Sequence, residues 1–119
     1  MPKRILIAED DFDSREALTK FAELAGYQVT AVADGAELLA IADIGKFDLV
    51  ITDLLMPDLN GVSANEIMKL KGDQTPIIAI TGMTKQDTVH IKDNFVKIFY
   101  KPIDARELFG YIGVLLKGL

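Results

Sequence analysis

The chain contains no cysteine and only one histidine among its 119 residues. The absence of cysteine excludes disulfide bonds, thiolate metal sites and cysteine nucleophiles. The single histidine, His90, stands in a polar segment, and we expect it to be exposed and without a catalytic role. Long apolar runs are also absent, and the short apolar stretch after Arg4 is too brief for a signal peptide, so a cytoplasmic location is expected.

Basic residues are fewer than acidic ones. The chain has 13 lysines and arginines against 18 aspartates and glutamates, which gives a formal net charge of -5 at pH 7. This balance argues against a general affinity for nucleic acid or for an anionic membrane, because both would repel the chain. The length fits one compact domain, residues 1–119, and half of the residues are hydrophobic, which is enough for a packed core.

Short apolar runs alternate with segments of helical periodicity. The predicted strands cover residues 5–8, 27–32, 49–51, 76–81 and 96–100. The predicted helices follow them, at about 13–25, 34–45, 62–71, 85–94 and 104–116. Five strand-helix repeats predict an α/β fold of the (βα)5 type, with a parallel sheet, right-handed crossovers and helices on both faces.

Two of the predicted helices begin with the spacing of a capping box. Asp13 precedes Glu16 by three residues, and Asp104 precedes Glu107 by the same interval. The helix over 85–94 is mostly polar, so we expect it to have low intrinsic stability and to be the element that moves. Its inward-facing residues are expected to be Val89, Ile91 or Phe95. Three further phenylalanines are expected in the core: Phe21, Phe47 and Phe109.

The carboxyl ends of parallel strands share one edge of the sheet, where open α/β folds bind their ligands. That edge collects six polar side chains: Glu9, Asp10, Asp11, Asp53, Thr81 and Lys101. Two carboxylates about 4 Å apart repel each other by roughly 4 kcal/mol in an intermediate dielectric, so such a cluster is tolerable if it binds a cation. Oxygen ligands without histidine or cysteine favour a hard ion, and the sequence therefore predicts a Mg²⁺ site.

Asp53 stands where a buried strand ends, and we interpret it as the reacting residue. A carboxylate can attack phosphorus to give an acyl phosphate if the charge on the transferred oxygens is neutralised. Lys101 offers a cation, and the Thr81 hydroxyl can donate to a phosphoryl oxygen. Taken singly, Asp53 is more simply a turn aspartate, Lys101 a surface charge and Thr81 a strand-end threonine. Their joint occurrence at successive strand ends favours a phosphoryl site.

With these residues in place, the chain resembles the CheY-like receiver domain of bacterial two-component response regulators. The resemblance covers essentially the whole chain and rests on four motifs: Ile5 to Asp11, Asp53 with Met56-Pro57-Asp58 and Gly61, Thr81-Gly82, and Lys101-Pro102. It implies the flavodoxin-like, doubly wound sheet of five parallel strands in the order 2-1-3-4-5, which agrees with the alternation of strands and helices.

The resemblance also implies a role for each site residue. Asp53 would accept a phosphoryl group from a phosphohistidine on a sensor histidine kinase or a histidine phosphotransfer protein. Asp10 and Asp53 would ligate Mg²⁺ directly, Glu9 would act through a coordinated water, and the backbone carbonyl of Leu55 would complete the metal site. Thr81 and Lys101 would bind the phosphoryl oxygens. The chain would be a signalling domain rather than an enzyme, with self-catalysed phosphoryl transfer and slow autodephosphorylation as its only chemistry.

The chain is expected to be a monomer or weak dimer. Its expected output is a change in its affinity for a downstream protein or an output domain. One residue departs from the family pattern: Ile98 stands three positions before Lys101, where an aromatic residue is usual. A docking module that works without phosphorylation is therefore the alternative. A phosphatase of the haloacid-dehalogenase type is disfavoured, because Leu55 stands where those enzymes place a second aspartate and the chain has no room for a substrate cap.

Overall fold

A five-stranded parallel sheet lies at the centre of the molecule, in the order β2-β1-β3-β4-β5. The computed structural model describes residues 2–56 and 59–117, so Pro57 and Asp58 of the predicted loop motif lie outside the described residues. The strands are β1 (Arg4–Ala8), β2 (Gln28–Val32), β3 (Leu49–Asp53), β4 (Ile77–Thr81) and β5 (Lys97–Tyr100). This strand order confirms the predicted flavodoxin-like fold class.

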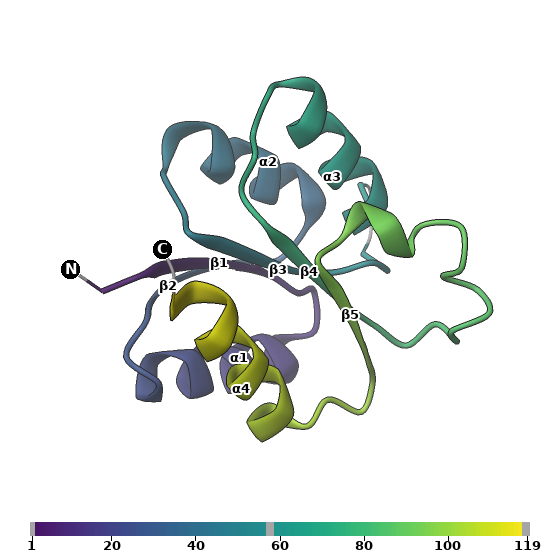
Figure 1. Cartoon of the computed structure of the whole chain (residues 1–119). Helices are drawn as coiled ribbons and strands as arrows, with labels where there is room; N and C mark the ends of the chain where they lie inside the picture. The colour runs from purple at the N-terminus through teal and green to yellow at the C-terminus, as the bar shows by residue number, and fades with distance from the viewer. Residues whose placement is uncertain (1, 57–58, 118–119) are drawn as a thin grey trace.

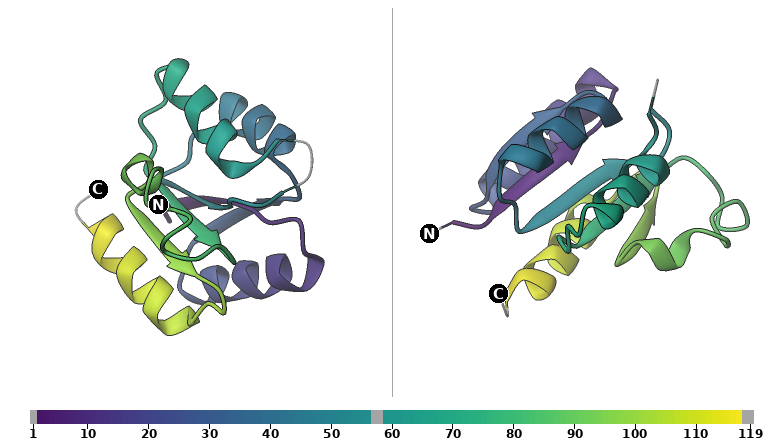
Figure 2. Two further views of the ribbon diagram at one scale, coloured as in Figure 1. Left: turned by 90° about the vertical axis from the view of Figure 1, so that its right-hand side faces the viewer. Right: turned by 90° about the horizontal axis from the view of Figure 1, so that it is seen from above.

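In the part of the chain that the structure describes, four α-helices cover the two faces of the sheet (Figure 1). They are α1 (Phe12–Leu24), α2 (Gly35–Ile44), α3 (Gly61–Leu70) and α4 (Ala105–Lys117). Helices α2 and α3 lie on one face, and α1 and α4 lie on the other (Figures 1 and 2). Within the described ranges, no helix is both long and apolar enough to cross a membrane.

Side chains of successive strand residues alternate between two hydrophobic cores. In β1, Ile5 and Ile7 pack in the core beneath α1 and α4, whereas Leu6 and Ala8 pack in the core beneath α2 and α3. All five residues of β3 are buried, as are all five of β4. Burial on both faces explains why these strands are continuous apolar runs rather than alternating ones.

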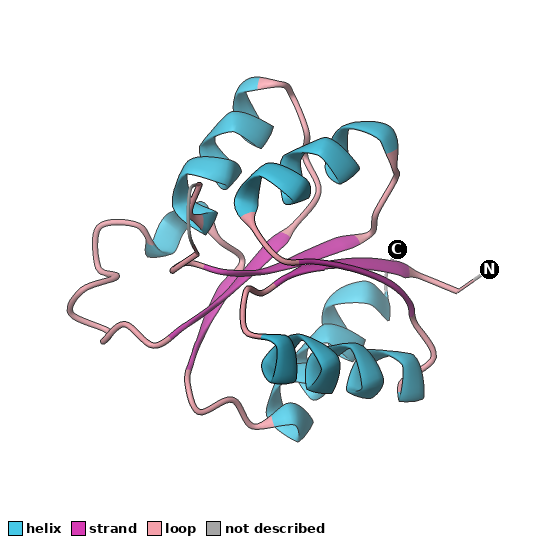
Figure 3. Ribbon diagram, turned by 180° about the vertical axis from the view of Figure 1, so that it is seen from behind, coloured by secondary structure: helices cyan, strands magenta, loops and turns pink. Residues whose placement is uncertain are grey.

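The prediction of a helix over residues 85–94 is wrong. The segment between β4 and β5 forms successive turns that end in a short 3-10 helix, Lys92–Asn94 (Figure 3). Thr84 and Asp87 do form a reciprocal capping pair, with both N–H···O distances at 3.2 Å. The helix does not propagate from this cap, because the segment has few apolar residues to pack against the sheet and tertiary packing supplies most helical stability.

Burial in this segment and in the first helix differs in part from expectation. Phe95 is buried, but Val89 is 52% exposed, and His90 is exposed as predicted. Phe21 is 49% exposed, so its assignment to the core was wrong, while Phe47 and Phe109 are half-buried against the two cores.

The cap of α1 also lies earlier than predicted. Asp11, not Asp13, is the N-cap, and its carboxylate accepts a hydrogen bond of 2.9 Å from the Ser14 N–H. Helix α4 begins as expected, because the Asp104 carboxylate accepts from the Arg106 N–H at 2.9 Å and from the Glu107 N–H at 3.3 Å.

Candidate functional site

The ends of β1 and β3 bring the acidic residues together. Ala8 of β1 pairs with Thr52 of β3, so Glu9 and Asp53 follow directly at neighbouring strand ends. One carboxylate oxygen each from Glu9, Asp10 and Asp53 lies within 4.8 Å of the others. Glu9 and Asp53 are buried, whereas Asp10 is exposed to solvent. The site is therefore a partly buried cluster that opens to solvent on the side of Asp10.

Lys101 supplies the positive charge of the cluster from the far end of β5. Its Nζ donates to Glu9 Oε1 at 2.9 Å and to Asp53 Oδ2 at 2.7 Å. Its backbone N–H donates to the Thr81 carbonyl at 2.7 Å, which continues the pairing of β4 with β5 just beyond the strand. The peptide bond between Lys101 and Pro102 is cis. The structure thus brings Lys101 and the three predicted carboxylates into one site.

Burial and neighbouring charges change the acidity of this site. Burial raises the pKa of Glu9 from its ordinary 4.5 to about 7; the hydrogen bond from Lys101 opposes this effect and the charge of Asp53 adds to it. Burial alone would lower the pKa of Lys101, but its ion pairs with Asp53 and Glu9 outweigh burial and raise it. Lys101 therefore stays protonated at neutral pH, while Glu9 can exchange a proton there.

The carboxylate of Asp53 is held in one orientation. Its Oδ1 accepts from the Leu55 N–H at 2.9 Å, and its Oδ2 accepts from Lys101. Gly61, at the start of α3, lies so close that a Cβ at this position would collide with the backbone carbonyl oxygen of Asp53. Only glycine lets α3 begin against the end of β3, and this packing fixes the backbone that carries Asp53.

Thr81 stands at the end of β4 and is fully buried. Its hydroxyl accepts a hydrogen bond of 3.1 Å from the Met83 N–H, which ties the start of the β4–β5 connection to the strand. Gly82, between them, is exposed, and a Cβ there would meet nothing within 4 Å. Close packing in this state therefore does not require glycine at position 82.

Residues of β5 next to Lys101 alternate between the two faces of the sheet. Phe99 packs in the core beneath α1 and α4, while Ile98 packs against the core beneath α2 and α3. The Tyr100 hydroxyl lies 2.6 Å from the hydroxyl of Thr88, which is buried in the β4–β5 connection. Sequence reasoning did not predict this contact, because it joins a turn to a strand twelve residues away and leaves no local pattern.

The acidic cluster fits a hard divalent cation in its chemistry. All of its donors are carboxylate oxygens, and Mg²⁺ in proteins typically takes one or two carboxylates together with waters. The exposure of Asp10 leaves a route for a hydrated ion to reach the buried pair. Glu9, Asp10 and Asp53 are the described residues whose carboxylates are placed to hold it.

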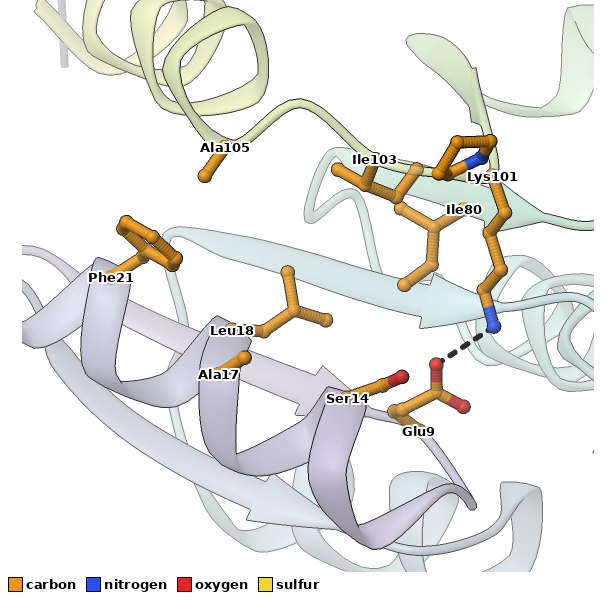
Figure 4. Close-up of a pocket in the computed structure, with 10 residues that line it drawn as sticks. Glu9, Ser14, Ala17, Leu18, Phe21, Ile80, Lys101, Ile103 and Ala105 are labelled. Carbon is orange, nitrogen blue, oxygen red and sulfur yellow. Dashed lines mark hydrogen bonds and ion pairs between the residues drawn. The ribbon is translucent and has the colours of Figure 1, made fainter.

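An apolar groove of about 280 Å³ opens beside the site (Figure 4). Ala17, Leu18 and Phe21 line it from α1, and Ile103 lines it from the segment before α4. Glu9 and Lys101 lie at one end of the groove, joined by their ion pair (Figure 4). The partial exposure of Phe21 follows from its position on the wall of this groove.

Known proteins share both the sequence pattern and the fold. A family model of the response regulator receiver domain matches residues 5–112. The chain belongs to this family. The receiver domain is a signalling domain of two-component systems, and the recognition made from the sequence motifs is confirmed.

Individual relatives differ in how much of their length the receiver domain matches. The response regulator receiver protein CpdR of Brucella abortus is 35% identical over 119 residues, with 96% of this chain and 97% of that protein covered. The transcription factor SKN7 of Saccharomyces cerevisiae is 32% identical over 115 residues, which cover 95% of this chain but 18% of that protein. The receiver domain thus spans about a fifth of the length of the SKN7 proteins that it matches.

A solved structure connects the fold to a metal site. The receiver domain of the sensor histidine kinase PA1611 from Pseudomonas aeruginosa PAO1 superimposes with a TM-score of 0.89 at 26% identity, with 98% of this chain and 99% of that chain covered. In that structure a magnesium ion is coordinated in the active site cleft.

Proposed function

We propose that this receiver domain is a phosphoacceptor switch in which Asp53 takes a phosphoryl group from a phosphohistidine. The observation that carries the proposal is the Lys101 ammonium, which lies 2.7 Å from Asp53 and 2.9 Å from Glu9 in a cluster of three carboxylates. A lysine shared by two buried acids at the end of a sheet is costly as a purely structural device, because burial penalises every charge in it. The same arrangement is useful when an anionic group must be bound.

In the proposed reaction an Asp53 oxygen attacks the phosphorus atom. The new bond is P–O, the bond to the donor imidazole nitrogen breaks, and the imidazole leaves with the electron pair of that bond. Lys101 is expected to follow the charge from the carboxylate to the phosphoryl oxygens, and the Thr81 hydroxyl is expected to donate to another of them. Glu9, Asp10, Asp53 and the Leu55 carbonyl would hold Mg²⁺, which when bound neutralises charge on the transferred oxygens.

Release of the signal is proposed to be slow self-catalysed hydrolysis. Water would attack phosphorus, the P–O bond to Asp53 would break, and inorganic phosphate would leave with the carboxylate restored. Two apolar residues, Leu55 and Met83, stand two positions after Asp53 and Thr81 respectively. They provide no side-chain group that could orient the water, which supports a long-lived acyl phosphate.

Signal output is proposed to run through the β4–β5 connection. Movement of Thr81 toward a phosphoryl group would give up the hydrogen bond from the Met83 N–H, which now anchors this connection. The segment has little regular structure to resist such a change. Its altered surface would change the affinity for a downstream protein or an output domain. The donor is expected to be a sensor histidine kinase or a phosphotransfer protein in the cytoplasm.

Intact mass measured after incubation with Mg²⁺ and acetyl phosphate tests the proposal. The parent should gain one phosphoryl group, which hydroxylamine should remove, whereas Asp53→Ala should gain none. Asp13→Ala removes an exposed aspartate from α1 and is the matched control, which should react like the parent. If the parent binds Mg²⁺ but gains no phosphoryl group, the domain is a docking module that works without phosphorylation, and the proposal is wrong.

A further inference from the structure

Arg15, on the first turn of α1, binds the backbone of all three residues in the acidic loop Glu9–Asp11. Its Nη1 donates to the Glu9 carbonyl at 2.8 Å and, at the long end of the hydrogen-bond range, to the Asp10 carbonyl at 3.4 Å. Its backbone N–H donates to the Asp11 carbonyl at 2.9 Å. One residue therefore satisfies three consecutive carbonyl groups between β1 and α1.

Two backbone N–H groups make further contacts of the acidic loop. The Glu9 N–H donates to the Val32 carbonyl at 3.1 Å and continues the pairing of β1 with β2. The Asp11 N–H donates to Glu9 Oε2 at 3.3 Å. With its carbonyl groups held by Arg15, the loop presents carboxylate oxygens of Glu9 and Asp10 within 4.8 Å of Asp53.

The position of Arg15 is itself fixed by the helix. Its guanidinium lies 5.5 Å from the ring centroid of Phe12, one turn earlier on α1. Phe12 is 62% exposed, and supporting this guanidinium is a physical role for it. Both bonds come from Nη1, whose two N–H groups lie in the guanidinium plane and bridge the two carbonyl oxygens at a fixed angle, whereas a lysine ammonium is a point donor on a flexible stem.

We propose that Arg15 is a positioning residue for the metal site: by holding the carbonyl groups of Glu9 and Asp10, it keeps their carboxylates arranged for a divalent cation. This inference rests on the proposed function, because it concerns the Mg²⁺ that would support reaction at Asp53. Arg15 acts through the loop and touches neither the cation nor the reacting atoms. In other proteins, loss of a residue that orients metal ligands typically weakens metal affinity 10- to 100-fold.

Positioning and charge predict opposite effects of removing Arg15. Its positive charge repels a nearby cation, so if charge were its whole contribution, Arg15→Gln would bind Mg²⁺ more tightly. If Arg15 positions the loop, the same variant binds Mg²⁺ more weakly. Arg15→Lys separates the positioning and charge explanations further, because it keeps the charge but loses the planar bridge. Positioning predicts weaker binding in both variants, whereas a pure charge effect predicts parental affinity for Arg15→Lys.

The test is the Mg²⁺ dissociation constant by isothermal titration calorimetry, with Lys20→Gln as the matched control. Lys20 is an exposed cation on the same helix, and its loss should leave the constant near that of the parent. Arg15→Gln should raise the constant about tenfold. Amide hydrogen exchange at Asp11 should also be faster in Mg²⁺-free Arg15→Gln than in the parent, with the free energy of unfolding measured in parallel to separate local from global opening.

The rate of phosphorylation by acetyl phosphate completes the design. For Arg15→Gln the rate should be low at limiting Mg²⁺ and approach the parental rate at saturating Mg²⁺. Unchanged or tighter Mg²⁺ binding in Arg15→Gln would overturn the inference, even if the variant were less stable. A parent that binds Mg²⁺ and is phosphorylated, with Arg15 variants that match it, removes this inference alone. A parent that binds no Mg²⁺ removes the proposed metal site as well.

Discussion

The buried carboxyl of Glu9 should make the Mg²⁺-free protein less stable as the pH rises through neutrality. Its pKa is raised from 4.5 to about 7, chiefly by burial. Below pH 4.5 the carboxyl is protonated in both the folded and the unfolded chain, so the pH has no effect through this group. Between pH 4.5 and about 7 the unfolded chain releases the proton while the folded chain keeps it, and each increment of pH favours unfolding.

The magnitude follows from the two pKa values. One pKa unit corresponds to about 1.4 kcal/mol, so the rise from 4.5 to about 7 corresponds to a loss of about 3 kcal/mol once the pH exceeds 7. Glu9→Gln removes the titrating group and keeps an oxygen that can accept from Lys101. The free energy of unfolding of Glu9→Gln, minus that of the parent, should therefore increase by about 3 kcal/mol between pH 4.5 and 8.

Urea unfolding followed by circular dichroism at several pH values measures this difference. Glu16→Gln, which removes an exposed glutamate from α1, controls for the loss of one negative charge. Saturating Mg²⁺ should restore stability to the parent above pH 7, because a bound cation favours the ionised carboxylate. A difference between Glu9→Gln and parent that stays constant across this range would refute the assignment of a raised pKa to Glu9.

Three further predictions concern the scaffold around the site. Gly61→Ala should lower the free energy of unfolding by about 1–3 kcal/mol, because its Cβ would collide with the Asp53 carbonyl. Gly113→Ala, in the open middle of α4, should instead raise it by about 0.5–1 kcal/mol, and urea unfolding distinguishes the two signs. Tyr100→Phe should cost about 1 kcal/mol through the lost hydrogen bond to Thr88, and an equal loss in the Thr88→Val background would show that the contact contributes nothing. Asp11→Ala should lower the melting temperature at neutral pH by removing the cap of α1. Because the capping Ser14 N–H lowers the pKa of Asp11, the difference in melting temperature from the parent should shrink as the pH falls below 3.8, and a constant difference would contradict the cap.

The sequence predicted the positions of the site residues well because backbone topology alone determines them. Glu9 and Lys101 each directly follow a strand and Asp53 ends one, and the carboxyl ends of parallel strands must meet at one edge whatever the loops do. The carboxylates and the lysine were therefore expected together, and the structure brings them together. Their proposed roles in phosphoryl transfer remain predictions.

The connection between β4 and β5 was beyond the reach of sequence reasoning. The capping pair of Thr84 and Asp87, a local signal for a helix, does form, yet the segment that follows it forms turns. One of its contacts joins Thr88 to Tyr100, and this contact depends on where β5 lies in the finished sheet. Local propensity cannot predict a segment whose stabilising contacts are made with a strand that follows it in the chain.

The contact of Arg15 with the acidic loop was not predicted, because the cap of the first helix was placed two residues too late. If α1 began at Asp13, Arg15 would lie at the very start of the helix, away from the acidic loop. With the cap at Asp11, the Arg15 N–H bonds the cap carbonyl, and its guanidinium lies above Phe12, within reach of the Glu9 carbonyl. Asp11 and Asp13, two residues apart, both suit a cap, and only the packed structure distinguishes them.

The charges of the site explain why Lys101 and a divalent cation can share it. When ionised, the carboxylates of Glu9, Asp10 and Asp53 carry three negative charges, and Lys101 balances only one of them. The remaining two match a divalent cation, so the proposed Mg²⁺ would not need to displace Lys101 from the site. The proposed phosphorylation of Asp53 would add roughly -1.5 to -2 charge units there, which Lys101 could meet only by leaving Glu9 or by moving toward the new oxygens. Because Lys101 adjoins the paired ends of β4 and β5, this shift in its contacts would link the proposed chemistry at Asp53 to Thr81 at the end of β4 and to the connection that carries Thr88.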